Sequence, residues 1–298
     1  MNTNMTLEKR ILSVLLTVIM VFSMLPIQVL GADGGAATVI TSGGEVAFNV
    51  YKDAVAYANQ HDGSTIKLQS DIDAPTYEDP ADMPFITGNV TLDLNGKSIN
   101  CVDIGSVSFD EEGEIVKDKA GTLTVTGSGS IGLLTMYCGA LTLNSGTVEE
   151  LRAEDFAVTV HIKGGTVESV VLSLRWDDKA TADISGGSVQ KLDLGTGTVN
   201  ITGGSHGSET ASWGVNGGTL NISGGSFSAL RLFVTSGKID LTGGEFEYIS
   251  TDPQAPFSEY QKLTMGSLLG DSCAFYSKDG SLVSADVLTL ENVKVVAD

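Results

Sequence analysis

The sequence predicts an all-β protein, a right-handed parallel β-helix of about nine coils with about 20 residues in each. Short segments of alternating apolar and polar residues recur, and a pair of glycines follows the five clearest of them. Glycine is abundant, with 36 residues among 298, but only 6 prolines are present, which excludes collagen. The repeat has no strict six-residue period, which disfavours a left-handed coil. A β-sandwich or barrel also has many short strands, but such folds rarely repeat one turn at constant phase.

Residues 1–32 predict a secretory signal peptide. Lys9 and Arg10 precede an apolar run over 11–30, and the small residues at 31–32 follow it. The run is near membrane-spanning length, so an N-terminal anchor is the alternative. We expect cleavage and therefore a secreted, extracellular protein at the cell surface, with no membrane segment in the mature chain.

Residues 33–63 predict a cap for the N-terminal end of the stem. Residues 38–50 form a strand pair around a glycine turn, and residues 51–60 place Tyr51, Ala54, Val55 and Ala58 on one helical face. An open end of a β-helix exposes unpaired strand groups, and a short helix would cover them.

The stem is predicted over residues 64–250. Five of its segments read almost alike: VTVHIKGGTV (158–167), ATADISGGSV (180–189), GTVNITGGSH (197–206), GTLNISGGSF (218–227) and GKIDLTGGEF (237–246). Their glycine pairs follow one another at intervals of 22, 17, 21 and 19 residues. Leu220 and Ile222 alternate with polar residues, as in a strand with one buried face. Stacking such coils pairs equivalent strands in parallel and encloses the apolar positions.

Residues 251–298 predict a small C-terminal cap. The repeat pattern stops after Tyr248, and helix-like and hairpin-like pieces follow, with a turn at 278–281. The last residues, VLTLENVKVVAD, are strand-like.

A family resemblance extends over nearly all of the mature chain. The opening over 39–68, the segment NVTLDLNGKSI (89–99) and the ISGG and LTGG turns resemble secreted β-helix surface proteins of Gram-positive bacteria. The segment LLGDSCAFYSKDGSLV (268–283) is similar to a tail that follows the repeats in those proteins. The family belongs loosely to the pectate-lyase-like superfamily, in a non-catalytic branch. The resemblance implies a β-helix on the cell surface.

The charge of the chain excludes a nucleic-acid binder. It has 37 acidic and 17 basic residues, a net charge of -20, and no basic face. We expect no cofactor, except that acidic pairs at coil edges could share a calcium ion if their loops stack. These pairs are Glu149-Glu150, Glu154-Asp155 and Asp177-Asp178. The acidic segment 110–114 is predicted as a hairpin tip and lacks the ligand spacing of a calcium loop.

Enzymatic candidates come from the superfamily that the chain resembles. Hydrolases of this fold use paired carboxylates with a histidine, which makes Asp177, Asp178 and His206 the catalytic candidates here. An Asn-Thr-Asp element is absent, and His206 takes the inward position that Phe227 takes one coil later. We therefore expect His206 to be a corner or core residue.

A lyase would need a basic residue beside acidic calcium ligands. Four basic residues lie in or beside second strands, and we expect them to be ordinary outward positions: Arg152, Arg175, Lys191 and Arg231. Cys101, Cys138 and Cys273 match no zinc motif, and we expect small buried side chains.

Two tryptophans are the candidates for ligand binding. Trp176 and Trp213 lie in connecting segments, where an exposed ring would suit stacking on a sugar. We therefore expect a non-catalytic extracellular module, a rigid adhesin-like stalk that contacts glycans or other surface proteins. The alternative is a polysaccharide lyase or glycoside hydrolase that acts in a groove along the coils. The sequence leaves the ligand and the oligomeric state open.

Overall fold

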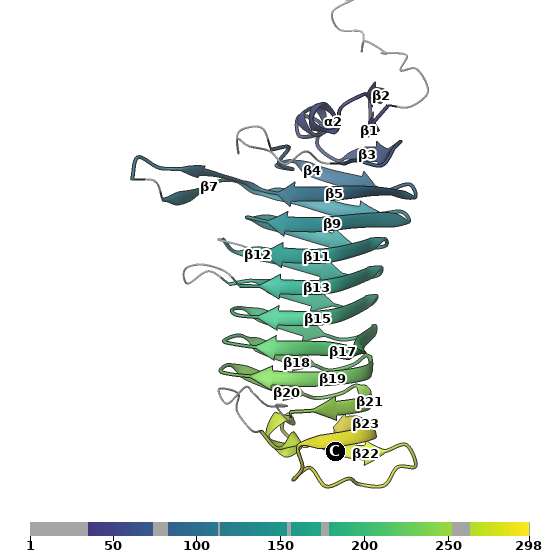
Figure 1. Ribbon diagram of the computed structural model, residues 1–298, viewed down its shortest axis with the longest axis vertical. Coiled ribbons are helices and arrows are strands. Elements are labelled where there is room, and N and C mark those ends of the chain that lie inside the picture. Colours follow the sequence, from purple (N-terminus) through teal and green to yellow (C-terminus); the bar gives the residue numbers. More distant parts are fainter. Residues whose placement is uncertain are drawn as a thin grey trace, which may run out of the picture.

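The computed structural model describes residues 35–73, 83–112, 114–153, 156–173, 179–251 and 263–297. The chain winds into a long stem whose coils lie one below another, with a helix and hairpin at the N-terminal end and two antiparallel strands at the other (Figure 1). The predicted signal peptide, residues 1–32, lies outside the described residues.

The first sheet has eleven strands, and nine of them, from β3 to β20, pair in parallel. In spatial order the strands are β2 (Gly44–Phe48), β1 (Ala37–Thr41), β3 (Ser64–Leu68), β4 (Asn89–Asp93), β8 (Gly121–Thr126), β10 (Gly139–Leu143), β12 (Val158–Ile162), β14 (Thr181–Ile184), β16 (Thr198–Ile201), β18 (Thr219–Ile222) and β20 (Lys238–Leu241).

The second sheet has ten strands, and eight of them, from β5 to β21, pair in parallel. In spatial order the strands are β5 (Lys97–Ile104), β9 (Gly129–Met136), β11 (Thr147–Ala153), β13 (Thr166–Leu172), β15 (Ser188–Leu194), β17 (Ser205–Val215), β19 (Ser226–Val234), β21 (Glu245–Ser250), β23 (Thr289–Ala297) and β22 (Cys273–Ser277).

Each coil gives one strand to each sheet, and the coils wind in a right-handed sense (Figure 1). The predicted right-handed parallel β-helix is therefore confirmed, but the number of coils is one lower than predicted. Eight strands of the first sheet, β4 to β20, are each followed by a parallel strand of the second sheet. The coil that begins at β3 has only an isolated parallel bridge, Ile72 to Ile99, because no full strand follows it among the described residues.

The interior consists of apolar rows that run down the stem. Leu220 and Ile222 are fully buried, as their alternation predicts, and equivalent residues lie in register above and below them. One such row of the first sheet is Leu92, Val125, Leu143, Ile162, Ile184, Ile201, Ile222 and Leu241. This continuous burial is what short strands require, because none of them buries a face alone.

The N-terminal cap matches its prediction closely. Strands β1 and β2 form an antiparallel hairpin that closes at Thr41 and Gly44. Helix α2 (Tyr51–Ala58) buries the four residues that the helical periodicity selects, Tyr51, Ala54, Val55 and Ala58. The helix covers the open upper end of the stem (Figure 1).

The C-terminal cap extends the stem. A 3₁₀-helix, η2 (Met265–Leu268), precedes β22 and β23, and β23 pairs antiparallel with β21. The predicted turn is present, since the Gly280 amide donates to the Ser277 carbonyl at 3.0 Å. The last two strands thus continue the second sheet, with reversed polarity.

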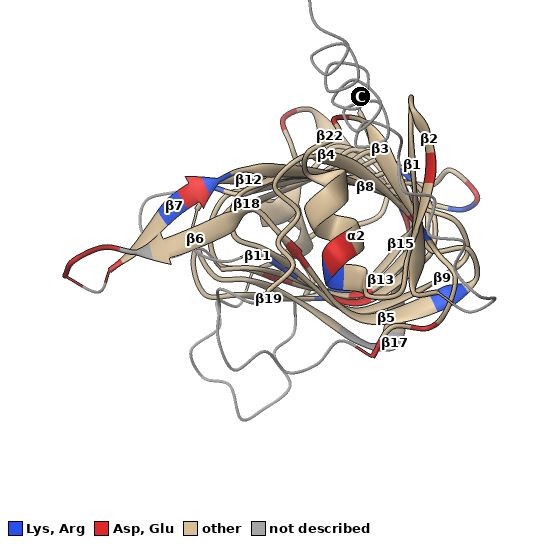
Figure 2. Cartoon of the chain, turned by 90° about the horizontal axis from the view of Figure 1, so that it is seen from above, with Lys and Arg blue, Asp and Glu red and all other residues tan. Residues whose placement is uncertain are grey.

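A hairpin projects from the upper part of the stem. Its strands are β6 (Ser106–Phe109) and β7 (Ile115–Lys119), and its acidic tip is the predicted one (Figure 2). Asp110 is at the tip, where its amide donates to the Glu114 carbonyl at 3.0 Å.

Candidate functional site: a groove on the second sheet

Of the three catalytic candidates predicted from the sequence, the structure describes only His206, so no catalytic site can be assembled from them. Asp177 and Asp178 lie outside the described residues, as does Trp176. His206 is described, and it lies inside the stem with 2% of its surface exposed. Its partner in register is Phe227, so it holds the inward position that the repeat predicts.

Both ring nitrogens of His206 have partners inside the protein. Nδ1 accepts from the Val189 amide at 3.2 Å, so Nε2 carries the proton and donates to the Gly203 carbonyl at 2.8 Å. Burial lowers the pKa of His206 because the charged imidazolium loses its hydration there. A neutral, internally bonded histidine is a structural residue, and a polysaccharide on the outside of the coil does not reach it.

Trp213 is also internal, contrary to the exposed ring that stacking on a sugar requires. Its side chain is fully buried, and its Nε1 donates to the Gln190 carbonyl at 3.0 Å. Its ring meets the rings of His206 and Phe227 edge-on, at centroid distances of 6.1 and 6.0 Å. Trp213 therefore fills the core of the lower stem.

A groove of about 600 Å³ lies on the outer side of the second sheet, over its C-terminal strands. Its exposed side chains come from β17, β19, β21 and β23 and from the turn after β22: Ser205, Ser226, Ser228, Glu245, Glu247, Lys278 and Lys294. Buried residues complete its lining, among them His206, Phe227 and Phe246. This volume lies within the range of small-ligand sites.

A bulge in β17 shapes one side of the groove. Gly207 pairs with Ala229 and Ser212 pairs with Arg231, so the four residues 208–211 lie opposite a single residue of β19. At Gly207 the backbone has a φ of +77°, and a Cβ there would lie 2.1 Å from the Ala229 carbonyl oxygen. Only glycine allows the two strands to approach this closely before the bulge departs.

The corner before the second sheet extends the hollow surface. Gly204, Gly225 and Gly244 follow one another down this corner, each with positive φ. A Cβ at Gly204 would lie 2.8 Å from the ring of His206, and one at Gly244 would lie 3.1 Å from the ring of Phe246. A second hollow of about 500 Å³ lies along them and shares Ser226, Glu245 and Lys294 with the groove. The groove therefore opens onto a glycine-lined strip.

The charged side chains of the groove are available to a ligand. Glu245, Glu247, Lys278 and Lys294 are all exposed. None of the four forms an ion pair with another described residue. Elsewhere some of the described basic residues do have such partners, as where Lys238 lies 3.1 Å from Asp240.

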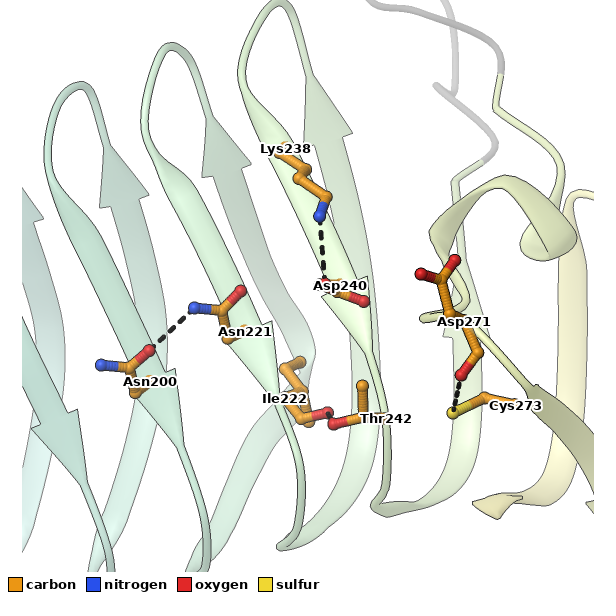
Figure 3. Close-up of polar contacts among 8 residues, drawn as sticks. All are labelled: Asn200, Asn221, Ile222, Lys238, Asp240, Thr242, Asp271 and Cys273. Atoms are coloured by element: carbon orange, nitrogen blue, oxygen red, sulfur yellow. Dashed lines mark hydrogen bonds and ion pairs between the residues drawn. The ribbon is translucent and has the colours of Figure 1, made fainter. Parts of the chain in front are cut away.

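The outer face of the first sheet has a different character. Side-chain amides form a ladder along it, in which Asn221 donates to Asn200 at 2.8 Å (Figure 3). Asn200 in turn donates to Asp183, also at 2.8 Å. One coil further along, Lys238 donates to Asp240 of the same strand, β20 (Figure 3). These groups largely satisfy one another, so this face is less open to a ligand than the groove.

No group of three or more metal-binding side chains gathers in the part of the chain that the structure describes. Two of the predicted outward basic residues do have local partners: Arg152 pairs with Glu150, and Arg231 lies 5.6 Å from the centre of the Tyr248 ring. The three cysteines are free; Cys138 is buried, and Cys101 and Cys273 are half-buried. Burial raises the pKa of the Cys138 thiol. The described residues include no helix with the length and apolarity to cross a membrane.

Sequence reasoning missed the groove, although it contained part of the signal. Ser205, Ser226 and Glu245 each follow a glycine pair at the same offset, which places them in one outward row. Lys294 joins that row only because β23 returns antiparallel beside β21. No repeat marks that pairing in the sequence.

Comparisons with protein-family models, with curated proteins and with solved structures give no match to this chain. The function must therefore be argued from the residues and their geometry.

Proposed function

We propose that this protein is a non-catalytic extracellular surface module, a rigid β-helix stem that contacts glycans through the groove on its second sheet. The signal-peptide pattern over 1–32 supports an extracellular location. Parallel sheets stacked over eight coils support a stiff stem, because each coil is fixed by its neighbours on both sides.

The observation that carries the proposal is the chemistry of the groove. Serine hydroxyls and charged side chains converge on one hollow, and all four charged groups lack a described ion-pair partner. Hydroxyl groups of a sugar donate to carboxylates and accept from ammonium groups, and such charge-assisted hydrogen bonds are the stronger ones. The groove lies on a rigid sheet, so little ordering is needed on binding.

The second part of the proposal is that the protein does not cleave the glycan that it binds. It is supported by His206, whose two ring nitrogens are engaged inside the stem. A general base must reach the proton that it removes, and this histidine does not face the outer surface.

The test is a glycan array combined with a polysaccharide-degradation screen on residues 33–298, with and without calcium. We expect binding without release of reducing or unsaturated sugar ends. Ser226→Arg places a long side chain in the groove and should abolish binding. The matched control is Thr219→Arg, an outward residue of the same coil on the first sheet, which should leave binding unchanged. Released sugar ends would instead establish an enzyme, and loss of binding in the control alone would move the site to the first sheet.

A further inference from the structure

The charges of the groove follow an order along the stem axis. In one row, Ser205 pairs with Ser226, Ser226 with Glu245, and Glu245 with Lys294. Two residues further along the strands, Ser228 and Glu247 face outward, and Lys278 follows at the turn after β22. The first row therefore runs from hydroxyl to carboxylate to ammonium, and the second runs the same way except that β23 lies between Glu247 and Lys278.

The charged groups of the groove are not paired with one another as in a salt bridge. Glu245 and Lys294 are register partners across β21 and β23, yet no ion pair joins them or any other two of the four charged groups. Each charge is exposed and stays hydrated. A ligand that lies over the groove would meet two carboxylates side by side and then two ammonium groups.

This arrangement selects against ligands of a single charge. A purely cationic ligand would be attracted at Glu245 and Glu247 and repelled at Lys278 and Lys294, and an anionic ligand would meet the reverse. An anionic polymer is also repelled by the net charge of -20. A neutral ligand gains no charge pairing. A ligand that carries both signs meets an opposite charge at each position.

We propose that the groove binds a zwitterionic glycan, a saccharide that has a free amino group and an acidic group on neighbouring units. Its ammonium group lies over Glu245 and Glu247, its acidic group lies over Lys278 and Lys294, and its hydroxyls contact Ser205, Ser226 and Ser228. This inference rests on the proposed glycan-binding function and names its ligand class.

The test uses four oligosaccharides of similar length and different charge. N-deacetylated heparosan alternates glucuronate and glucosamine and is zwitterionic. Heparosan is anionic and a chitosan oligomer is cationic. A chitin oligomer, in which every amino group is acetylated, is neutral. Binding to residues 33–298 is measured by isothermal titration calorimetry at low ionic strength. We expect the zwitterionic probe to bind about tenfold more tightly than each of the others, since several exposed charge pairs contribute less than about 1 kcal/mol each.

Charge variants then assign the two ends of the ligand. Glu245→Gln with Glu247→Gln should shift the preference to heparosan, and Lys278→Gln with Lys294→Gln should shift it to the chitosan oligomer. The matched control is Lys191→Gln with Asp193→Asn, two exposed residues of β15 outside the groove, which should leave the preference unchanged. All six positions are exposed, and circular dichroism verifies that the variants fold.

Two outcomes would overturn the inference in different ways. If the neutral probe or a single-charge probe binds as tightly as the zwitterionic one, the ligand class is wrong and glycan binding stands. If none of the four binds and the glycan array is also blank, the proposed function fails, and the ligand class fails with it.

Discussion

One inward row of the second sheet changes from aliphatic to aromatic side chains on its way down the stem. Val167 and Val189 are followed by His206, and then by Phe227 and Phe246, whose rings stack at 4.9 Å. The change begins in the coil whose strand bulges, and Trp213 is buried in the same coil. His206 suits this junction because it adds ring volume and accepts the Val189 amide, which faces the irregular strand.

This position predicts a pH dependence of stability. The pKa of His206 is lowered by burial from an ordinary value of 6.5, so below pH 6.5 the unfolded chain binds a proton that the folded chain does not. The stabilisation is complete above pH 6.5 and is lost as the pH falls, by up to about 1.4 kcal/mol per pH unit. Urea unfolding at pH 7.5 and pH 5.0 should show a larger loss for the wild type than for His206→Phe.

The control for this measurement is His61→Asn, which removes a half-buried histidine outside the stem. This variant keeps His206 and both of its internal hydrogen bonds. An equal pH dependence in the wild type and in His206→Phe would contradict the neutral, internally bonded state of His206.

At the scale of the element, the corners limit how closely the coils stack. At Gly197, which opens a coil, φ is +91° and a Cβ would lie 2.1 Å from the Ala180 carbonyl oxygen. That oxygen accepts the Thr198 amide at 2.8 Å, so it is not free to move. Gly63 also has positive φ, +72°, but nothing lies within 4 Å of its Cβ position. A comparison of Gly197 with Gly63 therefore separates the effect of backbone strain from the effect of steric contact.

Gly197→Ala should therefore destabilise the protein more than Gly63→Ala. The left-handed backbone costs about 1–2 kcal/mol in both variants, and the steric clash at Gly197 adds about 2 kcal/mol or more. Thermal or urea unfolding of the two variants measures the difference. Equal losses would mean that the coils tolerate wider spacing at this corner than the register indicates.

The elements also explain which features could be predicted from the sequence. Five strands of the first sheet, from β12 to β20, keep a period of two and are followed by a glycine pair, so inward residues such as Leu220 and Ile222 could be predicted directly. The position of Trp213 could not, because the extra residues in β17 interrupt that period. The antiparallel return of β23 was also hidden, because it depends on pairing between segments that do not repeat. The groove combines the last two features, and so it escaped prediction.

At the scale of the whole molecule, the stem depends on its ends. Parallel coils leave an open edge at each end, and such edges invite pairing between molecules. Helix α2 covers the upper end, and β23 pairs with the edge of β21 at the lower end. The hairpin of β6 and β7 projects from the stem, and its two strands pair only with each other.

Removal of the C-terminal cap should make the protein associate. A chain of residues 33–251 exposes the edge of β21 and uncovers Phe246 and Ile249, so we expect oligomers or aggregates by size-exclusion chromatography with light scattering. Replacement of residues 107–118 by two glycines removes the hairpin and should leave the oligomeric state of residues 33–298 unchanged. A truncated chain in the same oligomeric state as residues 33–298 would show that β23 does not protect the edge.

The central claim is that the groove on the second sheet is the place where a glycan binds and remains intact. The most direct measurement is a crystal structure of residues 33–298 with the oligosaccharide that binds most tightly. We predict an uncleaved saccharide along the row Ser205, Ser226, Glu245 and Lys294. A saccharide bound on the outer face of the first sheet, or a cleaved product in the groove, would contradict the claim.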